Sequence, residues 1–148
     1  MESFTRRESI PFIAAPGYDL EKYFQAVAGH ETDRCPDCYQ LRLDATAACA
    51  AASGFDTFSS SLLISHRQQH DRIISAARAA QASSGVRFEY ADLRKRYSDS
   101  RIMTKPLELY RQQYCGCLYS EYERFRHDSD GSAVNTAEQS TGEDITED

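Results

Sequence analysis

The order of apolar and polar positions predicts alternating strands and helices along the chain. Three short apolar runs predict strands at residues 10–14, 55–58 and 86–90. Apolar side chains at helical spacing predict helices over 19–28, 36–53, 67–83, 100–111 and 118–127. Strands separated by helices require crossover connections. The pattern therefore indicates an α/β protein with a Rossmann-like parallel sheet and helices on both faces.

Residues with known helix-end preferences support these boundaries. Asp19 can cap the first helix, and Pro36 suits the first position of the second. Gly54 and Gly85 follow the second and third helices, where glycine commonly ends a helix. We expect the third helix to bury one apolar face, made of Ile73, Ile74, Ala77 and Ala80.

The acidic charge of the chain is concentrated at one end. The formal net charge is −6, yet seven of the 23 acidic residues and none of the 17 basic ones lie in residues 128–148. That segment has no aromatic residue and is rich in Ser, Thr and Gly, which predicts a disordered acidic tail. Residues 1–127 are nearly neutral and are predicted to form a single α/β domain.

The sequence also bears on the compartment. No apolar run approaches the length of a membrane span, so no membrane partner is expected. No secretory signal precedes the cysteines. We therefore expect a cytoplasmic protein in a reducing compartment, where paired thiols usually bind a metal or pass electrons rather than form structural disulfides.

Cys35 and Cys38 form the first of two thiol pairs. Because Pro36 suits the first helical position, the pair is predicted at a helix N-terminus, where backbone N–H groups and the helix dipole favour thiolates. Arg34 and Arg42 add positive charge nearby. This spacing suits tetrahedral zinc, an iron–sulfur cluster or a dithiol/disulfide couple. The alternative is two ordinary core cysteines.

Cys115 and Cys117 form the second pair, separated only by Gly116. A disulfide between them would close a small, strained and readily reduced ring. Glycine between them removes the side chain that would obstruct the required backbone geometry. The pair thus suits electron transfer, or alternatively it completes a four-sulfur metal site with Cys35 and Cys38.

Cys49 differs from the other four cysteines. It lies 11 residues beyond Cys38 on the same predicted helix, about 16 Å away at the helical rise, so it cannot share a small centre with Cys38. Alanines flank it on both sides, and it is interpreted as a small buried apolar residue.

At these residues the chain resembles the QueH-type epoxyqueuosine reductases. The similarity covers roughly residues 10–120, and its most specific stretch is Leu109-Tyr-Arg-Gln-Gln-Tyr-Cys-Gly-Cys-Leu-Tyr-Ser120. The second is Arg34-Cys-Pro-Asp-Cys-Tyr-Gln-Leu-Arg-Leu43. Shorter matches stand in the same order as in the family, at 17–20, 54–58, 61–65, 68–70 and 92–94.

The resemblance implies an oxidoreductase that reduces epoxyqueuosine to queuosine in the anticodon loop of tRNA, the final step of queuosine biosynthesis. It implies a [4Fe–4S] cluster, with Cys35 and Cys38 among its ligands, and a redox-active pair made of Cys115 and Cys117. The implied partners are tRNA carrying epoxyqueuosine and an electron donor, either a protein or a small reductant.

The chain departs from the family at its beginning. The family's opening strand, its loop with two adjacent cysteine ligands, and the helix and strand that follow have no counterpart here. We therefore expect a chain that lacks about 50 residues, the length of such a unit, and the first strand or strands of the sheet. In that case the chain is a fragment, or Cys115 and Cys117 occupy the vacant iron sites, or the chain is inactive.

Removing an epoxide oxygen takes two electrons and two protons, so an acid must protonate the departing oxygen. The candidates are Asp92, His70 and Tyr114. Asp92 is preferred because the ends of parallel strands face ligand crevices, and its alternative is an ion pair with Arg94 or a strand-end cap. His70 is interpreted as a helix-surface residue, Tyr114 has a core position as its alternative, and His30 and His127 are assigned to the surface.

A basic stretch with interspersed tyrosines is the predicted tRNA-binding surface. Cationic and aromatic side chains together suit phosphate contacts and base stacking. The assigned substrate-binding residues are Arg94, Lys95, Arg111 and Tyr114, and the same stretch includes Arg96, Tyr97, Arg101, Lys105 and Tyr110. Without the resemblance, a solvated loop beside ordinary helices is the simpler interpretation.

Two other functions remain open at this point. One is a non-catalytic module that holds zinc with Cys35, Cys38, Cys115 and Cys117. The other is a simple dithiol oxidoreductase without a metal.

Overall fold

The computed structural model describes residues 2–15, 17, 19–107, 109–110 and 112–129, and of residues 127–129 it describes the backbone alone. The chain divides into two compact units, Met1–Leu109 (unit 1) and Tyr110–Asp148 (unit 2). Each unit is described by itself.

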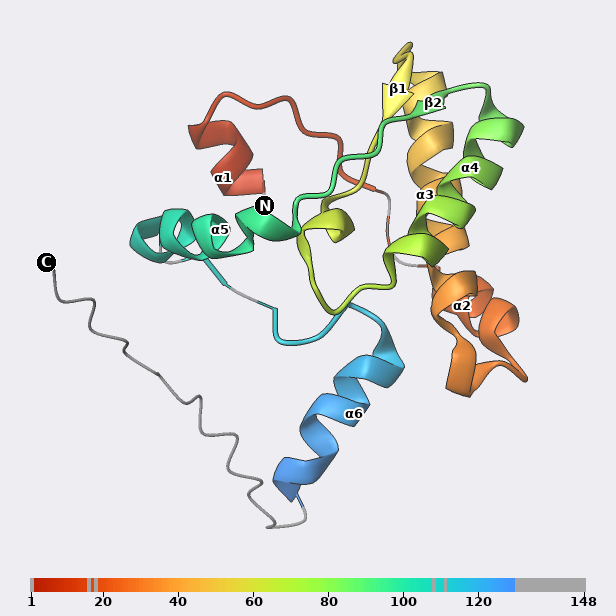
Figure 1. The fold of residues 1–148 in the computed structure, drawn as a ribbon, viewed down its shortest axis with the longest axis vertical. Helices are drawn as coiled ribbons and strands as arrows, with labels where there is room; N and C mark the ends of the chain where they lie inside the picture. The colour runs from red at the N-terminus through yellow and green to blue at the C-terminus, as the bar shows by residue number, and fades with distance from the viewer. Residues whose placement is uncertain (1, 16, 18, 108, 111, 130–148) are drawn as a thin grey trace, which may run out of the picture. The chain divides into compact units, whose positions relative to one another are not determined.

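Unit 1 contains the parallel sheet and most of the helices (Figure 1). Its longer elements are α1 (Glu2–Arg7), α2 (Leu20–Val27), α3 (Cys35–Ala52), β1 (Thr57–Phe58), α4 (His70–Ser84), β2 (Arg87–Phe88) and α5 (Tyr97–Thr104). Short 3-10 turns connect them: η1 (Glu31–Asp33), η2 (Ser61–Ile64), η3 (Arg94–Arg96) and η4 (Lys105–Leu107). The described part of unit 2 contains α6 (Leu118–Ser129).

The two strands pair in parallel, which confirms the α/β class. Thr57 is opposite Arg87, and Phe58 is opposite Phe88. The Phe58 and Phe88 rings pack on one side of the pair, with centroids 5.4 Å apart. Because α4 makes the crossover from β1 to β2, the arrangement is the strand–helix–strand unit that the sequence predicts.

The core lies between α3 and α4, which pack alongside each other (Figure 1). From α3 it takes Leu43, Ala47 and Ala50, and from α4 it takes Ile73, Ala76, Ala77 and Ala80. Small alanines on both surfaces let the helix backbones approach closely. As α3 contacts β1 and α4 contacts β2, the two helices form one layer against the strands. The sequence analysis also predicts a larger sheet with helices on both of its faces, and that part stays a prediction.

The predicted strand at 10–14 is wrong. These residues form no strand, and the described sheet consists of β1 and β2. The Ile10 amide instead donates a hydrogen bond to the Thr5 carbonyl at 2.8 Å, which turns the segment back onto α1. Ile10, Phe12 and Ile13 are exposed. A strand needs a neighbour for its backbone hydrogen bonds, and an apolar run does not reveal whether that neighbour exists.

Most helices match their predicted bounds, and α2 begins after Asp19, whose carboxylate accepts the Lys22 amide at 2.9 Å. The helix predicted over 100–111 is shorter: α5 ends at Thr104 and continues as the turn η4. Pro106 has no amide hydrogen for the helical ladder and disfavours its continuation.

The remaining predictions on organisation are partly outside the described residues. Helix α6 continues to Ser129, two residues into the predicted tail, and from residue 130 onward the tail lies outside the described part of the chain. Among the described residues, no helix combines the length and apolar character needed to cross a bilayer.

Candidate functional site

The N-termini of α3 and α4 lie side by side in unit 1. The Tyr39 hydroxyl, in the second turn of α3, donates a hydrogen bond to Gln68 Oε1 at 2.7 Å. The Gln69 amide, immediately before α4, donates to the same hydroxyl at 3.3 Å. Arg72 in the first turn of α4 forms an ion pair with Asp33, just before α3. These contacts place the start of both helices at one end of unit 1 (Figure 1).

Cys35 and Cys38 occupy the first turn of α3, as predicted. Arg34 is the N-cap, Cys35 is the first helical residue, and the Cys38 amide donates to the Arg34 carbonyl at 3.1 Å. Cys35 is half-buried and packs against the core, whereas Cys38 is buried. Residues three apart share a helix face, so the two sulfurs belong to the same side of α3. The helix dipole there favours the thiolate forms.

Arg72 adds a positive charge that sequence reasoning missed. The pKa of its guanidinium is raised, chiefly by the hydrogen bond to Asp33, with smaller contributions from Cys35 and Tyr39. The guanidinium therefore lies within electrostatic reach of Cys35. The two partners of the ion pair are 39 residues apart in the chain, so no local pattern reveals it.

The chemistry of the donors suits a soft metal centre. Two thiols one helical turn apart at a helix N-terminus fit two ligand positions of an iron–sulfur cluster or of zinc. Across the part of the chain that the structure describes, no group of three or more His, Cys, Asp or Glu side chains gathers as a metal site.

Cys115 and Cys117 lie at the start of α6 in unit 2. The Glu121 amide donates to the Cys117 carbonyl at 3.0 Å, which makes Cys117 the N-cap of the helix. Cys117 is buried and Cys115 is half-buried. Gly116 has a φ of 86°, in the left-handed region that a residue with a side chain seldom adopts. Both thiol pairs thus lie at helix N-termini.

Ser120 connects the two cysteines of unit 2. The Cys115 thiol donates to Ser120 Oγ at 3.0 Å, and the Ser120 hydroxyl donates to the Cys117 carbonyl at 2.8 Å. Sequence reasoning did not single out Ser120, although it lies three residues after Cys117 in the motif and can therefore reach back over the first turn.

Tyr114 precedes this pair and is half-buried. Its ring meets the edge of Phe125 with centroids 6.2 Å apart. Its pKa is raised, chiefly by partial burial and further by Glu121, so the phenol keeps its proton at neutral pH. Arg111, the other assigned substrate-binding residue next to it, lies outside the described residues.

Asp92 follows β2 and is engaged with Arg94. Arg94 donates from Nε to Oδ1 at 2.8 Å, from Nη2 to Oδ2 at 2.5 Å, and from its amide to Oδ1 at 3.1 Å. These bonds hold the pKa of Asp92 well below its usual range. The structure thus contains the Asp92–Arg94 ion pair, which the sequence analysis gives as the alternative to a proton-donating role for Asp92. Donation of a proton by Asp92 stays a prediction, and it would require that pair to open.

His70 is buried, so its assignment to the helix surface is wrong. Only 8% of the residue is exposed, and neither ring nitrogen has a hydrogen-bond partner among the described residues. The imidazole meets the Tyr90 ring edge-on at 6.4 Å. Because α4 begins at His70, this residue shares a face with Ile73 and Ala77, which is the buried face.

Cys49 is exposed, so its interpretation as a buried residue is also wrong. The buried face of α3 contains Leu43, Ala47 and Ala50. Cys49 follows Ala47 by two positions, about 200° around the helix, and therefore lies away from the core.

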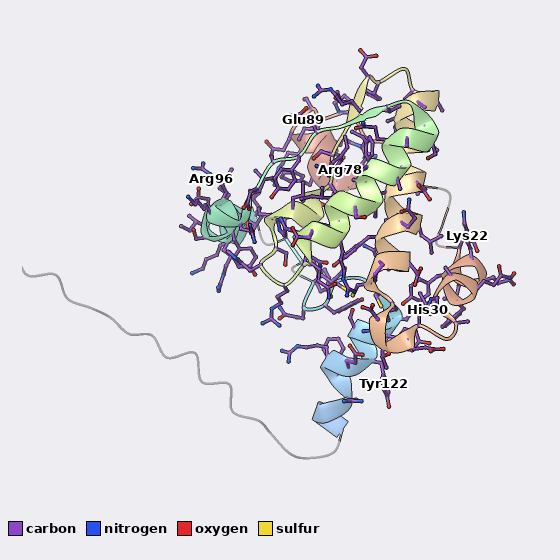
Figure 2. The ribbon with its side chains drawn as sticks, turned by 45° about the vertical axis from the view of Figure 1, so that its right-hand side comes forward. Lys22, His30, Arg78, Glu89, Arg96 and Tyr122 are labelled. Carbon is purple, nitrogen blue, oxygen red and sulfur yellow. The ribbon has the colours of Figure 1, made fainter. Side chains whose placement is uncertain are left out.

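The basic stretch of unit 1 extends from η3 through α5 to the first residue of η4. Arg96, labelled in Figure 2, has 74% of its side chain exposed and pairs with Asp99 at 3.0 Å. Lys95, Arg101 and Lys105 are exposed around it. Ile102 and Met103 are also exposed, so this surface combines positive charge with apolar side chains.

Comparison with known proteins identifies the family. A family model described as epoxyqueuosine reductase QueH matches residues 1–123, a range that includes both thiol pairs. A protein of that name from Dehalococcoides mccartyi is 52% identical over 125 residues, which cover 84% of this chain and 69% of the relative.

Two further relatives share that name. The one from Acinetobacter baylyi is 34% identical over 125 residues, covering 79% of this chain and 57% of the relative. The one from Thermotoga maritima is 33% identical over 113 residues, covering 72% and 59%. The chain thus spans a little more than half the length of these two relatives, and it belongs to the epoxyqueuosine reductase QueH family.

Proposed function

We propose that this chain reduces epoxyqueuosine to queuosine in the anticodon loop of tRNA. The observation that carries the proposal is the family match, which extends continuously over both thiol pairs. Supporting it, Cys35 and Cys38 lie in the first turn of α3, and Cys115 and Cys117 lie immediately before α6. Thiolates at such positions are suited to ligating iron and to passing electrons.

Cys35 and Cys38 are proposed as two ligands of a [4Fe–4S] cluster. Their placement one turn apart on a single helix face fits this role, and Arg72 supplies positive charge near Cys35. When bound, such a cluster supplies electrons one at a time. The protein's contribution is to hold the two sulfurs rigidly, because α3 packs against α4 from its first turn onward.

Cys115 and Cys117 are proposed as a dithiol/disulfide couple. Oxidation of the two thiols to a disulfide releases two electrons and two protons, which matches what the removal of an epoxide oxygen requires. Gly116 allows the tight turn between them, and Ser120 orients the Cys115 thiol. An electron donor, either a protein or a small reductant, returns the disulfide to the dithiol.

tRNA is the proposed substrate and partner. Lys95 and the Arg94 guanidinium, which Asp92 orients, would contact phosphates. Arg111 and Tyr114, which belong to unit 2, are proposed as further tRNA contacts from their place in the sequence. The exposed side chains of η3 and α5 supply both cationic and apolar groups for the contact.

Anaerobic purification of the full chain tests the metal assignment. We expect a brown protein with broad visible absorbance and bound iron and sulfide. Replacing both ligands, as Cys35→Ser with Cys38→Ser, should abolish the colour. Cys49→Ser is the matched control, because Cys49 is an exposed cysteine of the same helix, and it should keep the colour. A colourless wild-type protein with stoichiometric zinc would contradict the proposal and favour a zinc-binding module.

A further inference from the structure

His70 combines burial with unsatisfied hydrogen-bonding capacity. Both ring nitrogens are buried without a partner among the described residues. Leaving a buried polar group unsatisfied destabilises the fold, so native proteins rarely do it without a functional reason. An imidazole always carries at least one N–H donor, and here no described group accepts a hydrogen bond from it.

His70 lies next to two features at which α/β proteins commonly bind ligands. His70 is the first residue of α4, a helix of 15 residues, so it lies at the positive end of the helix dipole. Tyr90 and Asp92, which follow the carboxyl end of β2, lie beside it: the Tyr90 ring packs against the imidazole, and Asp92 is within electrostatic reach of it. In parallel α/β sheets, ligands bind at this end of the strands.

An ion pair lies near His70. Arg94 is held by three hydrogen bonds to Asp92, so its guanidinium has a fixed orientation. Asp92 is an ionised carboxylate and has no proton to offer while that pair is intact. Of the Asp92–Arg94 pair and His70, it is therefore the imidazole that can act as an acid, since a protonated histidine is the commonest general acid in enzymes.

We propose that His70 is the proton donor to the oxygen that leaves the substrate's epoxide. This inference rests on the proposed function. In the reaction, two carbon–oxygen bonds break, a carbon–carbon double bond forms, and the oxygen leaves as water. It takes two electrons from the reduced dithiol of the proposed function and two protons. His70 supplies the first proton as the imidazolium and becomes neutral, the oxidation of the dithiol releases the second, and His70 takes up a proton again after the product leaves.

The first test compares turnover with binding. His70→Ala should lower the single-turnover rate by about 100-fold or more, the usual contribution of a general acid, while tRNA affinity changes little. Added imidazole should restore part of the rate, which a purely structural histidine would not show. His30→Ala is the matched control, because His30 is a histidine with 64% of its side chain exposed. An unchanged rate in His70→Ala would overturn the proposal.

The second test uses the wild-type chain and needs no turnover, so it also serves if His70→Ala fails to fold. The probe is an anticodon stem-loop RNA carrying epoxyqueuosine, and the readout is the ¹⁵N chemical shift of the His70 ring. We expect a shift with this RNA and a smaller one with the queuosine form, which lacks the oxygen. Equal shifts, or none, would overturn the proposal.

The two tests separate this inference from the proposed function. If the wild-type chain reduces no epoxyqueuosine, the proposed function fails. The ring nitrogen shift then still decides whether His70 contacts the epoxide oxygen, because it depends on binding alone. If the chain turns over and the histidine variant is unaffected, the proposed function stands and the assignment of His70 falls.

Discussion

The Tyr39 hydroxyl donates a hydrogen bond to Gln68 Oε1 at 2.7 Å, joining residues that are 29 positions apart. It also accepts the Gln69 amide at 3.3 Å, so one phenol links the start of α3 to the start of α4. Cys35 begins the first of these helices and His70 begins the second. This contact therefore fixes the spacing between the proposed cluster ligands and the proposed proton donor.

Replacing Tyr39 with phenylalanine should loosen that junction. The ring would still fill its buried position, but Gln68 and the Gln69 amide would lose their partner, at a cost of about 1–3 kcal/mol in the free energy of unfolding. Denaturant titration measures this. Tyr122→Phe is the matched control, because Tyr122 is exposed (Figure 2) and its change should be within about 0.5 kcal/mol. Equal effects of the two variants would contradict the role given to Tyr39.

Replacing Ser120 with alanine should make the Cys115 thiol less reactive. In the thiol form, the Ser120 hydroxyl accepts from Cys115 and donates to the Cys117 carbonyl. When the thiolate forms, the hydroxyl would turn to donate to the sulfur instead, and alanine removes that stabilisation. We expect alkylation of Cys115 to slow by about tenfold, the effect of ~1.4 kcal/mol. Mass spectrometry of the alkylated peptide follows the rate. Ser120→Thr keeps a hydroxyl and should react nearly as fast as the wild type, and a slow threonine variant would argue against the hydrogen bond.

Replacing Asp92 with asparagine should weaken tRNA binding more than it slows the chemistry. The variant releases Arg94, which loses its fixed orientation, so KM should rise several-fold. At saturating tRNA, kcat should stay close to that of the wild type. A variant without activity even at saturation would show instead that Asp92 donates the proton.

The lowered pKa of Asp92 predicts how the stability of the fold and the reaction rate depend on pH. Because it lies below the ordinary carboxyl value, the group binds its proton less readily in the folded chain. Its ion pair therefore stabilises the fold above the unfolded pKa, and this contribution is lost only as the pH falls through the folded pKa. The pH–rate profile of the wild type should accordingly show no step from Asp92 in the neutral or mildly acidic range.

Replacing Lys95 with alanine should weaken tRNA binding and reduce its salt dependence. Removing one phosphate contact should lower the slope of log affinity against log salt concentration by about 1. Filter binding across a salt series measures the slope. Lys22→Ala is the matched control, because Lys22 is an exposed lysine of α2 outside the basic stretch (Figure 2). Identical slopes for the two variants would remove Lys95 from the proposed surface.

The elements that follow local rules could be predicted from the sequence. The apolar spacing and end residues of α3 and α4 are local, and so is the placement of Cys35 at a helix start. The segment at 10–14 was misassigned because a strand depends on a distant partner. Pairings such as Arg72 with Asp33 likewise depend on the tertiary structure, and no local sequence pattern predicts them.

Two side chains were misplaced for a different reason. His70 and Cys49 both lie on predicted helices, but the buried side depends on where the helix begins and on which face meets its neighbour. The sequence predicts that this helix begins at residue 67, whereas α4 begins at His70, which lies on the same buried face as Ile73. In a helix nearly uniform in alanine, such as the second half of α3, apolar periodicity hardly distinguishes the inner face from the outer one.

Nucleoside analysis of tRNA after anaerobic incubation with the full chain and dithionite tests the central claim most directly. The account predicts that epoxyqueuosine is converted to queuosine by the wild type and by Cys49→Ser. It predicts no conversion by Cys35→Ser or by Cys115→Ser. Conversion that persists in both of these variants would contradict the assignment of the chemistry to the two thiol pairs.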